Sequence, residues 1–78
     1  MIKTKKGLLA WYFKKGNEDF GNDLIDLQNN LSNEIKTEKF WDQTELRLTL
    51  KKQTWKSSFY LYFHRNNENN IECYRIVY

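Results

Sequence analysis

Hydrophobic and polar residues repeat along this chain with two different periods, one typical of a helix and one typical of strands. Between residues 20 and 35, apolar side chains recur every three or four positions, at Phe20, Leu24, Leu27, Leu31 and Ile35. This spacing predicts one amphipathic helix that ends near residues 36–37. Asn17 or Asn22 is placed to cap its start, where acidic side chains also suit the positive end of the helix dipole.

Four other segments have the composition or the alternation of β-strands. They are residues 7–14, 44–51, 54–65 and 71–78, and the asparagine-rich run 66–70 predicts a turn before the last of them. The pattern predicts the α+β class, with residues 1–78 forming a single domain in the order β-α-β-β-β. We expect one helix on one face of a mainly antiparallel four-stranded sheet, and a flexible basic tip at residues 1–6.

The register of the strands follows from matching apolar faces between neighbours. A two-residue turn at residues 52–53 would pair Leu46 with Phe59, and a turn at residues 67–70 would pair Phe63 with Tyr74. Tyr12 would share the face away from the helix if the first strand joins in phase. The other residues predicted on that face are Glu45, Arg47, Thr49, Lys56, Tyr60, Tyr62, His64, Cys73, Arg75 and Val77.

Charge is distributed unevenly, although the net charge is only +3. Residues 1–15 carry five lysines and no acid, and residues 16–45 carry eight acids against two lysines. Residues 46–65 carry five basic residues and no acid. The predicted helix is therefore acidic and the predicted sheet is basic.

Composition narrows the class of protein further. An apolar share of 40% and an aromatic share of 17% are too high for a disordered chain. No apolar run is long enough to span a membrane, so we expect no membrane partner. One cysteine allows no intrachain disulfide, which favours a cytoplasmic location. One cysteine and one histidine are too few for a zinc site, and we expect neither a metal nor another cofactor.

Three interpretations of the predicted sheet face stay open. Exposed tyrosines beside basic groups offer rings for base stacking and cations for phosphates, as single-stranded nucleic acids require. The same residue types dominate protein interfaces. They are also ordinary strand residues, with Tyr62 and Arg75 stabilising each other across strands. The candidate binding residues on this face are Arg47, Lys56, Tyr60, Tyr62, His64 and Arg75.

Metal-free RNA cleavage is an enzymatic alternative, because it needs only a base, an acid and cations for the phosphate. Such groups are present as Glu45, His64, Arg47 and Arg75. The terminal run Tyr74-Arg75-Ile76-Val77-Tyr78 resembles the last strands of the small mRNA-cleaving toxins of bacterial toxin–antitoxin pairs. The resemblance implies RNA cleavage on an antiparallel sheet. However, such toxins place two helices before the sheet, and the predicted register separates Glu45 from His64 by about 13 Å.

His64 would face Cys73 in the predicted register, which is the arrangement of a nucleophile and its base. No oxyanion hole or third orienting group is recognisable in the sequence. We therefore interpret the two residues as an ordinary pair at the edge of a sheet.

The leading hypothesis is a small non-enzymatic binding protein that acts on a protein partner, with a homodimer as an alternative. An acidic helix face would mimic nucleic-acid phosphates against a basic groove, and its residues are Asp19, Asp23, Asp26 and Glu34. The lysine- and asparagine-rich composition suggests a phage or mobile-element inhibitor of a host nuclease or defence protein, an anti-CRISPR-like role. A module that binds single-stranded nucleic acid and an mRNA-cleaving toxin are the alternatives.

Overall fold

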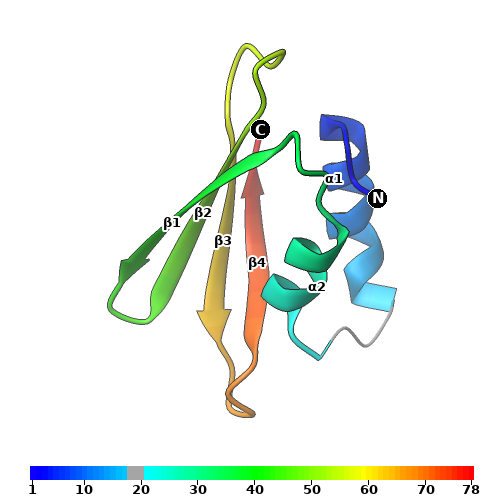
Figure 1. Cartoon of the computed structure of the whole chain (residues 1–78). Helices are drawn as coiled ribbons and strands as arrows, with labels where there is room; N and C mark the ends of the chain where they lie inside the picture. The colour runs from blue at the N-terminus through cyan, green and yellow to red at the C-terminus, as the bar shows by residue number, and fades with distance from the viewer. Residues whose placement is uncertain (18–20) are drawn as a thin grey trace.

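The computed structural model describes residues 1–17 and 21–78, in which two α-helices lie beside one antiparallel sheet (Figure 1). The elements are α1 (Lys5–Lys14), a 3-10 turn (Lys15–Asn17), α2 (Asp23–Asn30), β1 (Lys36–Asp42), β2 (Glu45–Lys51), β3 (Phe59–Arg65) and β4 (Ile71–Val77). Neighbouring strands in the sheet follow the chain, in the order β1-β2-β3-β4. The predicted α+β class and the antiparallel sheet of four strands are confirmed, but the element order is α-α-β-β-β-β.

Helix α1 occupies the segment that was predicted to be the first strand. Thr4 caps it, since its Oγ1 accepts a hydrogen bond from the backbone N–H of Gly7. Leu8 and Trp11 are buried three residues apart, and Tyr12 packs against the same core. The strand prediction was wrong because the aromatic run was interpreted with a period of two, whereas its buried side has a helical spacing.

Helix α2 is about half as long as the predicted helix. Asn22 caps it by accepting a hydrogen bond from the N–H of Ile25, as one of the two predicted caps. Its buried apolar residues are Leu24 and Leu27, from the predicted stripe. Phe20, the first residue of that stripe, lies outside the described residues.

The end of α2 is set by a contact with the N-terminus. The N–H of Ile2 donates to the carbonyl of Asn30 at 2.6 Å, and the N–H of Ser32 donates to the carbonyl of Ile2 at 2.8 Å. Leu31 between them has an extended backbone, so the helical stripe stops before Ile35. Residues 1–6, predicted as a flexible tip, thus include one residue that is hydrogen-bonded on both sides.

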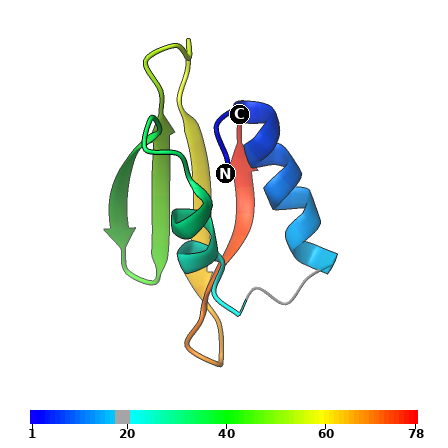
Figure 2. The ribbon, with the colours of Figure 1, turned by 45° about the vertical axis from the view of Figure 1, so that its right-hand side comes forward.

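Strand β1 was not predicted, because all seven of its residues are exposed and no alternation of buried side chains marks it. A two-residue turn at residues 43–44 joins it to β2, and Gln43 has a φ of 55° there. In Figure 1 and Figure 2, β1 lies at the edge of the sheet farthest from α1 and α2. The helices therefore cover the β3–β4 side and leave β1 open.

The observed register between β2 and β3 differs from the predicted one by four residues. Leu46 pairs with Phe63, and Leu50 pairs with Phe59. The prediction was wrong because it assumed the shortest turn, whereas the connection runs through residues 52–58. An even shift keeps every side chain on its predicted face.

Between β3 and β4 the register contains a bulge. Leu61 pairs with Ile76 as expected and Tyr62 pairs with Arg75, but Phe63 pairs with Cys73 and not with Tyr74. Tyr74 is the extra residue on β4. Cys73 is consequently turned into the core, only 2% exposed, instead of lying on the opposite face as predicted.

The core lies between the helices and the covered face of the sheet, which we call the closed face. On β2 and β3 every second side chain is fully or almost fully buried there. The core side chains of these strands are Leu46, Leu48, Leu50, Phe59, Leu61 and Phe63. Burial of each stabilises the fold by roughly 1.5–3 kcal/mol before entropy is subtracted.

Candidate functional site

The sheet face away from the helices, which we call the open face, carries the side chains that alternate with the core. Directly paired residues of antiparallel strands point to the same side. The register therefore aligns four side chains across the whole sheet. We call them the arginine–aromatic row, and they are Phe40 on β1, Arg47 on β2, Tyr62 on β3 and Arg75 on β4.

Each arginine of this row makes a cation–π contact with a ring of the row, and Arg47 also contacts the ring of Tyr60 outside it. The guanidinium of Arg47 lies 5.3 Å from the ring centroid of Phe40 and 6.0 Å from that of Tyr60. The guanidinium of Arg75 lies 5.1 Å from the ring of Tyr62. Such contacts hold both partners in place, and an arginine that stacks on a ring still presents N–H donors in its own plane. The row thus offers ring surfaces and oriented donors together.

A second line of side chains lies beside the row, towards the turns that follow β1 and β3. Asp42 pairs with Glu45, Glu45 with His64, and His64 with Glu72. We call these four residues the acid–base row. The Nε2 of His64 lies 3.5 Å from the Glu72 carboxylate. The predicted separation of Glu45 from His64 was wrong, since they are direct cross-strand partners.

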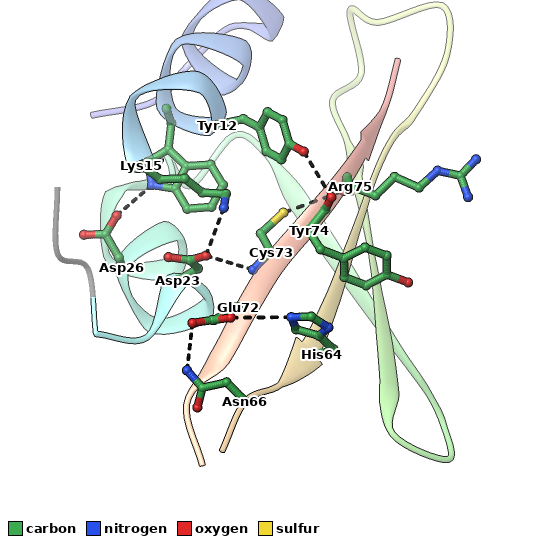
Figure 3. A network of polar contacts seen from close by, with 11 residues as sticks. Tyr12, Lys15, Asp23, Asp26, His64, Asn66, Glu72, Cys73, Tyr74 and Arg75 are labelled. Carbon is green, nitrogen blue, oxygen red and sulfur yellow. Dashed lines mark hydrogen bonds and ion pairs between the residues drawn. The ribbon is translucent and has the colours of Figure 1, made fainter. Parts of the chain in front are cut away.

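Tyr74 joins the two rows because the bulge turns both Tyr74 and Arg75 to the open face (Figure 3). Its hydroxyl donates a hydrogen bond to Oε1 of Glu45, and this bond raises the pKa of Tyr74. Its ring stacks on His64 with centroids 5.0 Å apart and lies 6.4 Å from the ring of Tyr62. Tyr74 therefore fixes the positions of Glu45 and His64 relative to the arginine–aromatic row.

Five of the six predicted sheet-face residues lie together on the open face. They are Arg47, Tyr60, Tyr62, His64 and Arg75. Lys56 does not belong to the group, because it lies in the loop between β2 and β3. The predicted facing pair of His64 and Cys73 does not form, since Cys73 pairs with Phe63 on the closed face.

Acidic residues predicted on the helix face make contacts within the protein. Asp23 accepts a hydrogen bond from the backbone N–H of Cys73 at 2.8 Å and pairs with Lys15 at 3.4 Å (Figure 3). Asp26 accepts a hydrogen bond from the indole N–H of Trp11 at 2.6 Å.

Glu34 lies beyond α2 and pairs with Lys52 at 3.3 Å. Asp19 lies outside the described residues. Asp23, Asp26 and Glu34, three of the four predicted acids, therefore already have partners inside the protein. They neutralise internal donors and cations instead of forming one uniformly free acidic surface.

Four residues of the site were missed by sequence reasoning, and they are Phe40, Asp42, Glu72 and Tyr74. Phe40 is 57% exposed on a strand without buried residues, so only its place opposite Arg47 reveals its role. Tyr74 was assigned to the closed face, and the bulge that turns it outward has no glycine to mark it. The adjacent rings of Phe40 and Trp41 between charged residues were the only signal of an exposed strand.

No protein-family model matches this chain, and no curated protein or solved structure matches it either. Among residues 1–17 and 21–78, no helix is long and apolar enough to cross a membrane. Within the same residues, His, Cys, Asp and Glu side chains form no group of three that could hold a metal ion.

Proposed function

We propose that this protein binds single-stranded nucleic acid on the open face of its sheet. The observation that carries the proposal is the arginine–aromatic row, in which ring and guanidinium alternate across four strands. Bases of a single strand stack on exposed aromatic rings, and the phosphates between them bind arginine donors. A row that alternates both groups suits a chain that alternates base and phosphate.

The two arginines favour this function over a purely structural use of the same rings. Arginine presents donors in a planar fork that matches the oxygens of a phosphate. Arg47 and Arg75 lie on β2 and β4, on either side of Tyr62. Both are exposed, so their donors face the solvent from which a ligand would come.

A protein partner is the prediction that competes with this proposal. That prediction includes an acidic helix face that binds a basic groove of the partner. The contacts of Asp23 and Asp26 with groups inside the protein weigh against this part of it. Its aromatic half would use the same open face. Binding experiments with a pure oligonucleotide separate the two, since no second protein is present.

The test is fluorescence anisotropy of a labelled oligouridine of about ten nucleotides, with oligothymidine for comparison. We expect Tyr62→Ala to weaken binding by about 1–3 kcal/mol, the usual contribution of one stacked base. Tyr78→Ala is the matched control, because Tyr78 is exposed but stacks on the closed-face residue Phe59. Equal losses in both variants, or no binding by the wild type at low salt, would contradict the proposal.

Salt dependence tests the phosphate contacts separately. Arg47→Gln should reduce the slope of log affinity against log salt by about 0.7 if Arg47 neutralises one phosphate of a single strand. Arg65→Gln is the control. The guanidinium of Arg65 lies 6.0 Å from the ring centroid of Trp41, a similar contact that lies outside the arginine–aromatic row. An unchanged slope in Arg47→Gln would remove Arg47 from the interface.

RNA cleavage is a second candidate function, favoured by the direct pairing of Glu45 with His64. In it, Glu45 takes the proton of a 2′-hydroxyl, whose oxygen attacks the phosphorus. The 5′-oxygen leaves with a proton from His64, which gives a 2′,3′-cyclic phosphate. The structure has two helices before the sheet, as the small mRNA-cleaving toxins do, whereas the sequence predicted only one helix.

Incubation of purified protein with labelled RNA tests this candidate. We expect cleavage products that end in a cyclic phosphate, and their loss in Glu45→Gln and in His64→Ala. Glu38→Gln is the control, because Glu38 is paired with Lys51 outside the acid–base row. RNA that is bound and stays intact would leave binding as the function.

A further inference from the structure

We infer that a small depression on the open face is a base-binding site selective for guanine, an inference that rests on the proposed nucleic-acid binding. The depression has a volume of about 80 Å³ and lies over β1, β2 and β3. It is lined by Phe40, Asp42, Glu45, Arg47 and Tyr62. It is the place where the arginine–aromatic row and the acid–base row meet.

The depression is lined by aromatic rings and an arginine at one end and by two carboxylates at the other. Phe40 and Tyr62 belong to the arginine–aromatic row, on either side of Arg47. Asp42 and Glu45, which pair directly with each other, form the adjacent end of the depression. A base that stacks on one of these rings would meet the carboxylate oxygens with its edge, and Arg47, whose guanidinium lies 5.3 Å from the Phe40 ring, would bind the phosphate.

Carboxylates select guanine because they only accept hydrogen bonds. Guanine has two adjacent donors, N1–H and the N2 amino group, which match the two oxygens of one carboxylate. Adenine and cytosine each place a ring-nitrogen acceptor beside their amino group, and uracil places a carbonyl on each side of its single donor. These acceptors face the carboxylate and are repelled by it.

The two carboxylates also differ in how they are held. Glu45 is half-buried and accepts the hydrogen bond of Tyr74, so its position is fixed before a ligand arrives. The Asp42 side chain is exposed, and within the described part of the chain no hydrogen bond or ion pair to its carboxylate is present. Like charges placed directly opposite each other destabilise a sheet, and a ligand with two donors relieves that repulsion.

The experiment compares labelled oligouridines of about seven nucleotides that differ only in the central base. We expect a central guanine to bind about 10- to 100-fold more tightly than adenine, cytosine or uracil, as one bidentate contact allows. Inosine, which lacks the N2 amino group, should fall between guanine and the others. Asp42→Asn or Glu45→Gln should remove the preference of the protein for the guanine oligomer over the all-uridine oligomer.

Glu38→Gln is the matched control, because Glu38 lies on the same face outside the depression and pairs with Lys51 at 3.0 Å. Equal binding of all the oligomers would overturn the guanine site and leave the proposed function intact. Binding of none of them would overturn both. A guanine preference that survives in Asp42→Asn and in Glu45→Gln would show that the carboxylates do not read the base.

Discussion

The two faces of the sheet are made from the same strands, but their side chains have different contacts. Phe63 and Tyr62 are neighbours on β3, yet Phe63 is fully buried and Tyr62 is part of the open arginine–aromatic row. Closed-face residues contact other apolar side chains, whereas open-face residues contact charged groups and rings at the surface. Stability and binding should therefore separate by face, even between adjacent residues.

The outer strand β1 shows where this division ends. Its closed-face residues include Trp41, which pairs with Leu46 but is 47% exposed. The helices cover the same face, but they lie away from the β1 edge of the sheet (Figure 1 and Figure 2). Its open-face residues Phe40 and Asp42 line the depression. Strand β1 thus contributes little to the core and a large part of the candidate site.

The largest expected effect is on stability, from a change on the closed face. Phe63→Ala should lower the free energy of unfolding by about 3–5 kcal/mol, the usual result of emptying a buried phenylalanine site. Tyr62→Ala, one residue earlier, should cost much less stability while weakening oligonucleotide binding. Urea unfolding followed by circular dichroism measures the difference. Similar losses of stability in the two variants would refute the separation by face.

A smaller loss is expected from the polar contact that ties the helices to the sheet. Asp23→Ala leaves the N–H of Cys73 and the Lys15 ammonium without their acceptor, and should cost about 1–3 kcal/mol. Asp42→Ala is the control, because its carboxylate is exposed on the open face, and it should be nearly neutral or stabilising. Urea unfolding again measures both variants. An equal loss of stability would show that the contacts of Asp23 with Cys73 and Lys15 do not stabilise the fold.

Residue parity explains how much of the site could be predicted from the sequence. The register error of four residues between β2 and β3 is even, so Arg47, Tyr60 and Tyr62 were still assigned to the correct face. The same error separated Glu45 from His64, and so hid the acid–base row. Face composition follows from alternation alone, whereas cross-strand partners depend on the length of a loop that carries no strong turn signal.

The remaining errors have local physical causes. A bulge of one residue reverses which side chains point to each face of the strand. Cys73 therefore lies on the closed face and Tyr74 on the open face, the opposite of the prediction. Helix α1 was hidden because its aromatic and aliphatic residues are also good strand formers. Its cap Thr4 and the spacing of Leu8 and Trp11 were visible signals of a helix. The fold class was predictable from the pattern, but the element order required the packing.

The last expected effect is a change of stability with pH, and it concerns Cys73, which the bulge places on the closed face. Burial raises the pKa of its thiol from 9.0 to about 12, so the folded protein keeps this proton at a pH where the unfolded chain loses it. The contribution to stability is fully present below pH 9 and is lost as the pH rises towards 12. The free energy of unfolding should fall by roughly 1 kcal/mol per pH unit in this window.

Other groups also titrate above pH 9, so the measurement compares the wild type with Cys73→Ala. The variant is less stable at neutral pH because it leaves a cavity, but it lacks the slope that belongs to the thiol. The stability difference between the two proteins should therefore shrink from about pH 9 upwards, as followed by urea unfolding at a series of pH values. A constant difference across this range would mean that the thiol ionises as readily in the folded protein as in the unfolded chain. Cys73 would then be accessible like an open-face residue, and the division of the sheet into two faces would fail at β4.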